Sequence, residues 1–253
     1  MLSQKVVILA AGLGKRMKSN LPKPLIPIEG KPMIKYLLEA IQQSGIDTPP
    51  IVVVSPDTKA AFTDALGCQV EYVLQTEQLG TGHALAQAEA VCVSADRIIV
   101  LYGDHPFITP ASIKSLLFLS DQHPHAVALL TTTVPNLEGD YVPFKNWSRI
   151  LRDQVGNIVG DKQVKDASAE ELKILELNPA IYSLPAPWVW DNLKRLTNKN
   201  AAAEYYLTDL LALAANQNLP IVSVDVSPFE VIGVNTPEEL AIASNLKGLS
   251  LQA

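Results

Sequence analysis

Residues 5–11 read KVVILAA, and residues 12–17 continue as GLGKRM. A continuous apolar run followed by glycines is typical of a strand that is buried on both faces of a parallel sheet. In open α/β sheets, ligands bind beyond the carboxyl ends of the strands. The loop that begins at Gly12 is therefore the first place to look for a functional site.

Similar apolar runs recur along the first half of the chain, and helical patterns lie between them. We expect strands at 51–54, 70–74, 97–101 and 126–133, and helices at 33–43, 58–66, 81–91 and 112–121. Strands that alternate with helices form βαβ units with right-handed crossovers. The pattern predicts an α/β fold of the Rossmann-like, doubly wound type, with a mostly parallel sheet.

The regular alternation ends after Thr133, which predicts a smaller antiparallel insertion. We expect a turn-rich segment at 135–146, a hairpin at 150–159, strands at 175–183 and 221–226, helices at 187–196 and 207–216, and a closing helix at 236–247 capped by Thr236. The predicted antiparallel hairpin turns around Gly156-Asn157. Because no linker is apparent, we expect a single domain over 1–253, with one half at about 1–133 and the other at about 134–235.

Composition excludes several classes of function. The 253 residues are 48% hydrophobic and 18% charged, with a formal net charge of −6. This charge argues against nucleic acid or an anionic membrane as a partner. The apolar runs are too short to span a membrane, and no signal peptide is visible. Two cysteines cannot form a disulfide framework or a zinc site by themselves. We expect a soluble, cytoplasmic protein.

The loop after the first strand carries groups suited to phosphate. Glycines allow backbone N–H groups to approach phosphate oxygens, and Lys15, Arg16 and Lys23 add positive charge. The spacing is neither that of a Walker A loop nor that of a dinucleotide fingerprint. A tight turn with solvated lysines is the alternative for this segment taken alone.

A second candidate segment, QTEQLGTGHA at 75–84, opens the helix after a predicted strand. The Gln75 amide offers a donor and an acceptor, which suits the imide edge of a pyrimidine. The Gly80-Thr81 step could bring backbone N–H groups close to a ligand. The alternative is that Thr81 is a simple helix cap.

Two further segments suggest a metal site. Asp104 directly follows the apolar strand and Tyr102-Gly103, at a place suited to Mg²⁺ on a nucleotide phosphate, because Mg²⁺ takes few protein carboxylates. Asn235 precedes the last predicted helix and could be a second ligand. The alternatives are an aspartate that caps the following turn and an asparagine in a turn.

Together these motifs resemble those of the sugar-1-phosphate nucleotidylyltransferases. The resemblance rests on LAAGLGKRM at 9–17, LPKP at 21–24, GKPM at 30–33, QTEQLGTGHA at 75–84, LYGD at 101–104, KDA at 165–167, EYYLTD at 204–209 and GVN at 233–235. It is most specific to the uridylyltransferase domain of the GlmU family, and it covers nearly the whole chain.

The resemblance implies a reaction and a role for each matching residue. The reaction is uridylyl transfer from UTP to a sugar 1-phosphate, most simply N-acetylglucosamine 1-phosphate, with Mg²⁺ as cofactor. The implied site comprises Arg16 and Lys23 as catalytic cations, Leu9, Ala10, Ala11, Gly12, Gln75, Gly80, Thr81, Tyr102 and Gly103 around the nucleotide, Asn178 at the sugar, and Asp104 with Asn235 at the metal.

The chain departs from the family on the acceptor side. Ser148 stands where the family has glycine, Gln163 where it has glutamate, and Pro179-Ala180 where it has Thr-Gly. A site built to bond particular hydroxyls discriminates strongly, so we expect weak use of N-acetylglucosamine 1-phosphate. Another sugar 1-phosphate, another pyrimidine nucleotide such as dTTP or CTP, or a non-catalytic nucleotide-sugar-binding regulator remain as alternatives.

The expected organisation also has two features outside the site. No hexapeptide-repeat region, which carries the acetyltransferase activity in the GlmU family, is visible in these residues. Nucleotide and sugar phosphate are the expected partners, and the sequence is compatible with a homo-oligomer.

Overall fold

The computed structural model describes residues 2–12, 17, 19–236 and 239–240. Its main sheet begins with strand β1 (Gln4–Leu9), which pairs in parallel with β4 (Ile51–Val54) and β6 (Arg97–Tyr102). Strand β5 (Glu71–Leu74) adds to β4, also in parallel. The parallel strands expected from the first half of the sequence are therefore confirmed.

The second half of the chain continues the same sheet. Strand β11 (Tyr182–Pro185) lies antiparallel between β6 and β7 (Val127–Thr133), and β12 (Ile221–Asp225) pairs with β7 in parallel. The full order is β5-β4-β1-β6-β11-β7-β10-β8-β9, with β12 attached to β7. The mostly parallel sheet is confirmed, with β11 as the antiparallel strand at its centre.

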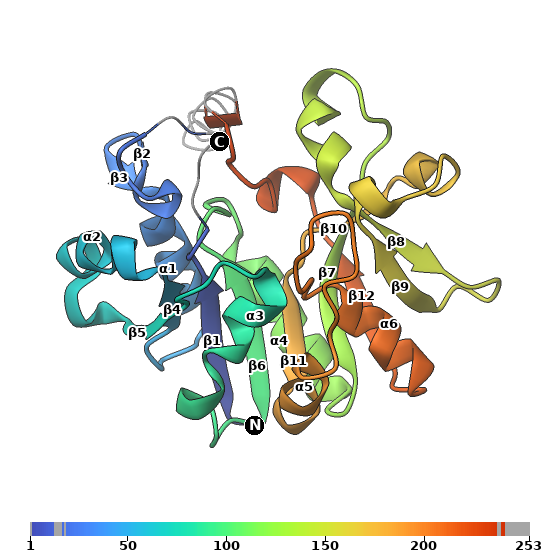
Figure 1. The fold of residues 1–253 in the computed structure, drawn as a ribbon, viewed down its shortest axis with the longest axis horizontal. Coiled ribbons are helices and arrows are strands. Elements are labelled where there is room, and N and C mark those ends of the chain that lie inside the picture. Colours follow the sequence, from blue (N-terminus) through green and yellow to red (C-terminus); the bar gives the residue numbers. More distant parts are fainter. Residues whose placement is uncertain (1, 13–16, 18, 237–238, 241–253) are drawn as a thin grey trace.

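A small antiparallel region extends from β7, as the sequence predicts. It contains β10 (Glu176–Asn178), β8 (Ser148–Arg152) and β9 (Ile158–Lys162). In Figure 1 this region lies on one side of the molecule, and the short β2–β3 hairpin (Pro27–Ile28 and Lys31–Pro32) lies on the other. The sheet between them carries the strand ends where a ligand would bind.

Helices cover both faces of the sheet because its strands are apolar on both sides. Val7 and Leu9 of β1 pack toward α3 (Thr81–Ala86), α5 (Ala186–Leu193) and α6 (Asp209–Asn216). Val6 and Ile8 pack toward α1 (Met33–Gln43), α2 (Pro56–Leu66) and α4 (Pro110–Gln122). This gives three layers, as expected of a doubly wound sheet.

The strand expected at 175–183 is two strands. Pro179 and Ala180 separate β10 from β11, and Ala180 has a φ of 59°, in the left-handed region. Proline donates no ladder hydrogen bond and a left-handed residue turns the chain, so the segment leaves one part of the sheet and enters another. The apolar pattern of the sequence concealed this break.

Two helices need comment because their observed extent differs from the predicted one or is only partly described. The helix expected at 81–91 ends at Ala86 and is followed by a 3-10 turn at Glu89–Val91. Most of the closing helix expected at 236–247 lies outside the described residues, but the Thr236 Oγ1 accepts the N–H of Glu239 at 3.2 Å. Among the described residues we find no helix with both the length and the apolar character needed to cross a membrane.

Candidate functional site

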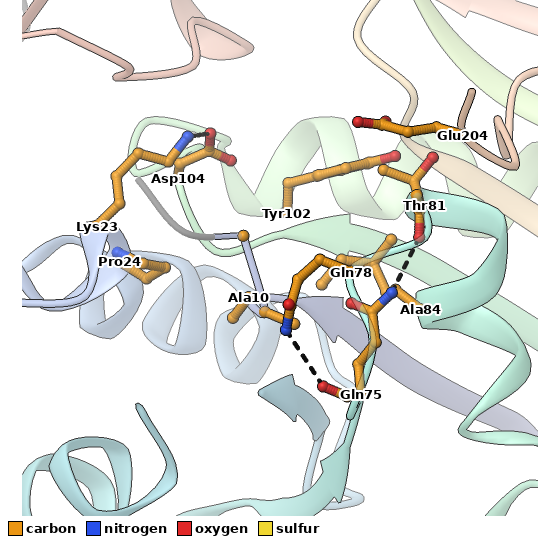
Figure 2. Close-up of a pocket in the computed structure, with 14 residues that line it drawn as sticks. Ala10, Lys23, Pro24, Gln75, Gln78, Thr81, Ala84, Tyr102, Asp104 and Glu204 are labelled. Carbon is orange, nitrogen blue, oxygen red and sulfur yellow. Dashed lines mark hydrogen bonds and ion pairs between the residues drawn. The ribbon is translucent and has the colours of Figure 1, made fainter. Parts of the chain in front are cut away.

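A pocket of about 360 Å³ lies at the carboxyl ends of β1, β5 and β6, where the sheet topology places a ligand site. Residues from five separate segments converge on it, and Figure 2 shows how they lie. Its lining comprises Leu9, Ala10, Ala11, Gly12, Lys23, Pro24, Gln75, Gln78, Gly80, Thr81, Ala84, Tyr102, Asp104 and Glu204. Most of the residues that the sequence singles out for the nucleotide therefore share one cavity.

The end of β1 forms one wall of the pocket. The Ala10 N–H donates to the carbonyl of Val53 at 2.9 Å, and the Gly103 N–H donates to the carbonyl of Leu9 at 3.1 Å. A Cβ on Gly103 would lie 2.9 Å from Cγ of Pro24, so only glycine fits this contact without movement. Gly103 thus lies behind the wall and supports the lining. Arg16 lies outside the described residues.

The segment from Gln75 to Thr81 forms the opposite wall. A Cβ on Gly80, whose φ is 112°, would lie 2.7 Å from the carbonyl oxygen of Tyr205, so this position needs glycine for both its conformation and its contact. The residue that caps α3 is Gly80, and the Thr81 hydroxyl accepts the N–H of Leu207 at 3.0 Å. Thr81 is therefore not a simple helix cap.

Gln75 is almost fully buried, with 3% of its surface exposed, and its amide has a fixed orientation. Its Nε2 lies 3.1 Å from the carbonyl oxygen of Gly80 and 3.1 Å from Nδ1 of His83. Both amide hydrogens therefore have partners in the protein, while Oε1 has none in the described part of the chain. Oε1 is the group that remains for a ligand.

Tyr102 crosses the floor of the pocket toward Thr81 (Figure 2). Burial raises the pKa of the Tyr102 hydroxyl well above its usual range, although a hydrogen bond with Thr81 opposes the shift. The hydroxyl is thus a neutral hydrogen-bonding group at any working pH.

Lys23, Asp104 and Asn235 meet at the mouth of the pocket. The Lys23 ammonium forms an ion pair with Asp104 and donates to Oδ1 of Asn235 at 2.8 Å. The N–H of Val234 donates to the carbonyl of Asp104 at 3.0 Å, which fixes the two segments together. Burial raises the pKa of Asp104, but the charge of Lys23 outweighs it, so the net pKa is lowered and the carboxylate is ionised.

The chemistry of these oxygen donors is compatible with a divalent metal ion. Asp104 and Asn235 supply one carboxylate and one amide oxygen, and both contact a cation, the Lys23 ammonium. Within the described ranges, no three His, Cys, Asp or Glu side chains gather as a complete metal site. Mg²⁺ on a nucleotide takes one or two protein oxygens and fills its shell with phosphates and water, so this sparse donor set suits it.

Asn178 lies apart from the pocket lining, in the antiparallel region. It is buried, with 4% of its surface exposed, and its Nδ2 donates to Asp161 at 2.9 Å and to the Tyr182 hydroxyl at 2.7 Å. Gln163 lies beside it and donates to Thr208 Oγ1 at 3.1 Å. The structure therefore gathers the acceptor-side residues around Asp161.

Sequence reasoning did not find several of these residues. Gln78 and Glu204 line the pocket at the end of β1. They lie in the QTEQLGTGHA and EYYLTD motifs, which were the only features of the sequence that could have pointed to them. Asp161 and Tyr182 had no motif. The only sign of Asp161 was an acidic residue in the otherwise strand-like run 158–161.

Fold and site together define the class of this protein as a nucleotidyltransferase domain. The chain belongs to the MobA-like NTP transferase domain family, whose model matches residues 6–175. It is similar to the bifunctional protein GlmU of Dechloromonas aromatica (strain RCB), with 40% identity over 237 residues that cover 93% of this chain and 50% of that protein. The bifunctional protein GlmU of Syntrophomonas wolfei is 39% identical over 241 residues, 95% of this chain and 52% of its own length. The chain thus spans about half the length of the curated relatives it matches.

Solved structures show the same fold. UDP-glucose pyrophosphorylase complexed with UDP-glucose matches with a TM-score of 0.78 and 20% identity, over 99% of this chain and 100% of that one. CMP:2-keto-3-deoxy-manno-octonic acid synthetase complexed with CTP matches with a TM-score of 0.68 and 22% identity, over 98% and 99% of the two chains. At these identities the likeness concerns the fold alone.

Proposed function

We propose that this protein transfers a uridylyl group from UTP to a sugar 1-phosphate, releasing pyrophosphate. N-acetylglucosamine 1-phosphate is the first acceptor to test, because the relatives of this chain are bifunctional GlmU proteins. The observation that carries the proposal is the meeting of Lys23, Asp104 and Asn235 at the mouth of the pocket. A site for a nucleotide base alone would not need this arrangement of charges.

In the proposed complex, the nucleotide lies along the end of β1. Leu9 to Gly12 contact the nucleoside and the phosphates, with Gly103 behind them, Tyr102 along the floor, and Gly80 and Thr81 on the opposite side. Gln75 Oε1 accepts the N3–H of uracil, which cytosine lacks, so this atom favours UTP over CTP. Asn178 belongs to the acceptor side.

The chemistry requires little of the protein beyond position and charge. A phosphate monoester has a second pKa of about 6, so the sugar phosphate is already a nucleophile near neutral pH and needs no general base. Its oxygen attacks the α-phosphorus of UTP, and the bond to the leaving pyrophosphate breaks. Lys23 and Arg16 neutralise the charge that develops on the phosphates. Mg²⁺, when held by Asp104 and Asn235, supplies further neutralisation of the triphosphate.

We also propose a domain organisation and a location. The chain forms one nucleotidylyltransferase domain in which residues 1–133, approximately, bind the nucleotide and residues 134–235 bind the sugar phosphate. The protein works in the cytoplasm, and a homo-oligomer is compatible with the exposed apolar side chains at Phe118 and Val93.

The decisive experiment measures pyrophosphate release across a grid of nucleotides and sugar 1-phosphates. We expect release with UTP and a sugar 1-phosphate, and loss of release when EDTA removes divalent metal. Release with dTTP or CTP in place of UTP would change the nucleotide assignment. UTP binding without release from any pair would identify a non-catalytic regulator and refute the proposed activity.

A further inference from the structure

Asp161 is the centre of a hydrogen-bond network in the acceptor half. It lies on β9, and its carboxylate accepts the Nδ2–H of Asn178 at 2.9 Å and the Nε2–H of Gln163 at 3.4 Å. The hydroxyls of Ser148 and Thr208 also hydrogen-bond to it. Four donors from different parts of the chain therefore point at one acidic group.

The Asn178 amide has no free donor as a result. One Nδ2 hydrogen goes to Asp161, and the other goes to the Tyr182 hydroxyl at 2.7 Å. The Oδ1 accepts the N–H of Ala180 at 2.8 Å, which prevents the amide from turning over. A carboxylate only accepts hydrogen bonds, so Asp161 independently requires the same orientation.

The Gln163 amide likewise has no free hydrogen-bond donor. Its Nε2 donates to Thr208 Oγ1 at 3.1 Å and to Asp161, which uses both amide hydrogens. Its Oε1 has no partner in the part of the chain that the structure describes. Of the two amides on the acceptor side, therefore, the Gln163 Oε1 remains for a ligand, whereas the Asn178 Oδ1 already accepts the N–H of Ala180.

Gln163 and Asp161 line a cavity of about 260 Å³ together with further charged groups, and Asn178 lies behind Asp161, outside the lining. The remaining lining residues are Lys162, Asp166, Thr197, Lys199, Asn200, Tyr206 and Asp209. Three of the lining side chains are aspartates. The donors with full charge belong to Lys162 and Lys199.

We infer that Asp161 determines acceptor specificity, because it occupies the amide donors of Asn178 and Gln163. The acceptor is then a sugar 1-phosphate that presents a hydroxyl or amino group, rather than an acetamido group, to the Gln163 amide. This inference rests on the proposed uridylyl transfer. A hydroxyl or amine supplies its own hydrogen to the Gln163 Oε1, which lines the cavity. An acetamido carbonyl would find neither amide able to donate to it.

The size of the effect follows from the cost of an unpaired carbonyl. A ligand whose buried carbonyl finds no hydrogen-bond donor binds about tenfold or more weakly. Sites that reject a substrate in this way discriminate strongly. We therefore expect kcat/KM for glucosamine 1-phosphate or glucose 1-phosphate to exceed that for N-acetylglucosamine 1-phosphate by about tenfold or more.

The test compares these three acceptors, with UTP as the donor, in the full chain and in Asp161→Leu. Removal of the carboxylate frees the amide hydrogens of Asn178 and Gln163. We expect the ratio of kcat/KM for the acetylated acceptor over the others to rise by about tenfold, with the KM for UTP unchanged. Asp153→Asn, in the exposed β8–β9 turn, is the matched control and should leave the ratio unchanged.

Asp161→Asn provides a second variant in case the leucine variant does not fold. Its NH₂ group must face either the Nε2 of Gln163 or the Nδ2 of Asn178, so one of these amides loses its acceptor and the ratio should move in the same direction. An unchanged ratio in a folded variant, or a wild-type preference for the acetylated acceptor, overturns the inference. A wild-type preference that Lys199→Met abolishes would show that lysine binds the carbonyl, which also overturns it. No pyrophosphate from any acceptor would instead refute the proposed function itself.

Discussion

The two regions that we propose bind the nucleotide and the acceptor use buried amides in different ways. In the pocket at the end of β1, the proposed nucleotide half, Gln75 is held by backbone and histidine partners, and it lines the cavity. In the antiparallel region, the proposed acceptor half, Asn178 is held by the buried network around Asp161 and is not part of the pocket lining. The comparison teaches that a residue that matches a family motif can bind a ligand only when its hydrogen bonds within the protein leave one of its polar atoms available.

The largest expected effect tests the charged mouth of the nucleotide half. Asp104→Asn removes the carboxylate that pairs with Lys23, and we expect turnover to fall by about a hundredfold or more, as for other losses of electrostatic stabilisation. Thermal unfolding should change little in comparison. Steady-state pyrophosphate release at limiting Mg²⁺ measures the effect, with the exposed Asp57→Asn as control. Wild-type rates in Asp104→Asn would remove this residue from the site.

The next effect concerns the pH dependence of stability in the acceptor half. Burial raises the pKa of Asp161 to about 6, against the opposing hydrogen bonds of Ser148, Asn178 and Thr208. Between the unfolded and folded pKa values the folded state binds more protons, so the free energy of unfolding falls as pH rises through this range. The loss is about 2 kcal/mol, since one pKa unit corresponds to about 1.4 kcal/mol and the site is partly solvated.

Urea unfolding at about pH 4 and about pH 7.5 captures most of this loss in wild type and is compared with the same measurement in Asp161→Asn. The nearby charged and titratable groups include Asp209, Tyr102 and Tyr182 and, in the same cavity, Lys162, Asp166 and Lys199, and they are common to both proteins. The difference between the two pH profiles therefore isolates Asp161. Parallel profiles would mean that the carboxylate is well solvated and does not form the centre of a buried network.

A third effect tests how the nucleotide half reads the base. Gln75→Leu removes the Oε1 that we expect to accept the uracil N3–H, so the preference for UTP over CTP should fall by about tenfold. Competition between the two nucleotides in pyrophosphate release gives this ratio. If Gln78→Leu lowers the preference and Gln75→Leu does not, the neighbouring glutamine reads the base.

The smallest expected effect concerns the backbone between β10 and β11. Ala180 has a φ of 59°, a conformation that glycine adopts without the steric cost of a Cβ. We expect Ala180→Gly to raise the free energy of unfolding by about 0.5–1 kcal/mol. Ala215→Gly, inside α6, should lower it by a similar amount because helical glycine is unfavourable. Destabilisation by both substitutions would contradict strain at Ala180.

Local sequence was sufficient to predict the nucleotide half. Strand β1, helix α1 and the polar groups at the strand ends lie in contiguous motifs, and parallel strands bring their carboxyl ends to the same edge of the sheet. The sequence could therefore place Asp104 and the segment from Gln75 to Thr81 in one site, because each directly follows a predicted strand. The contacts around that pocket, such as the close packing of Gly80 against the backbone of Tyr205, could not be predicted because they join segments that are distant in the sequence.

The sequence by itself determined the fold class, the family and most of the residues that line the pocket at the end of β1, because each depends on local periodicity or on a contiguous motif. Only the tertiary structure decided where β10 ends and β11 begins, and that Asp161 takes the amide hydrogens of Asn178 and Gln163. Hydrogen-bond partners in the acceptor half come from β8, β9, β10 and the residue before α6. Pairing among separate strands depends on the register of the whole sheet, and no local pattern records it.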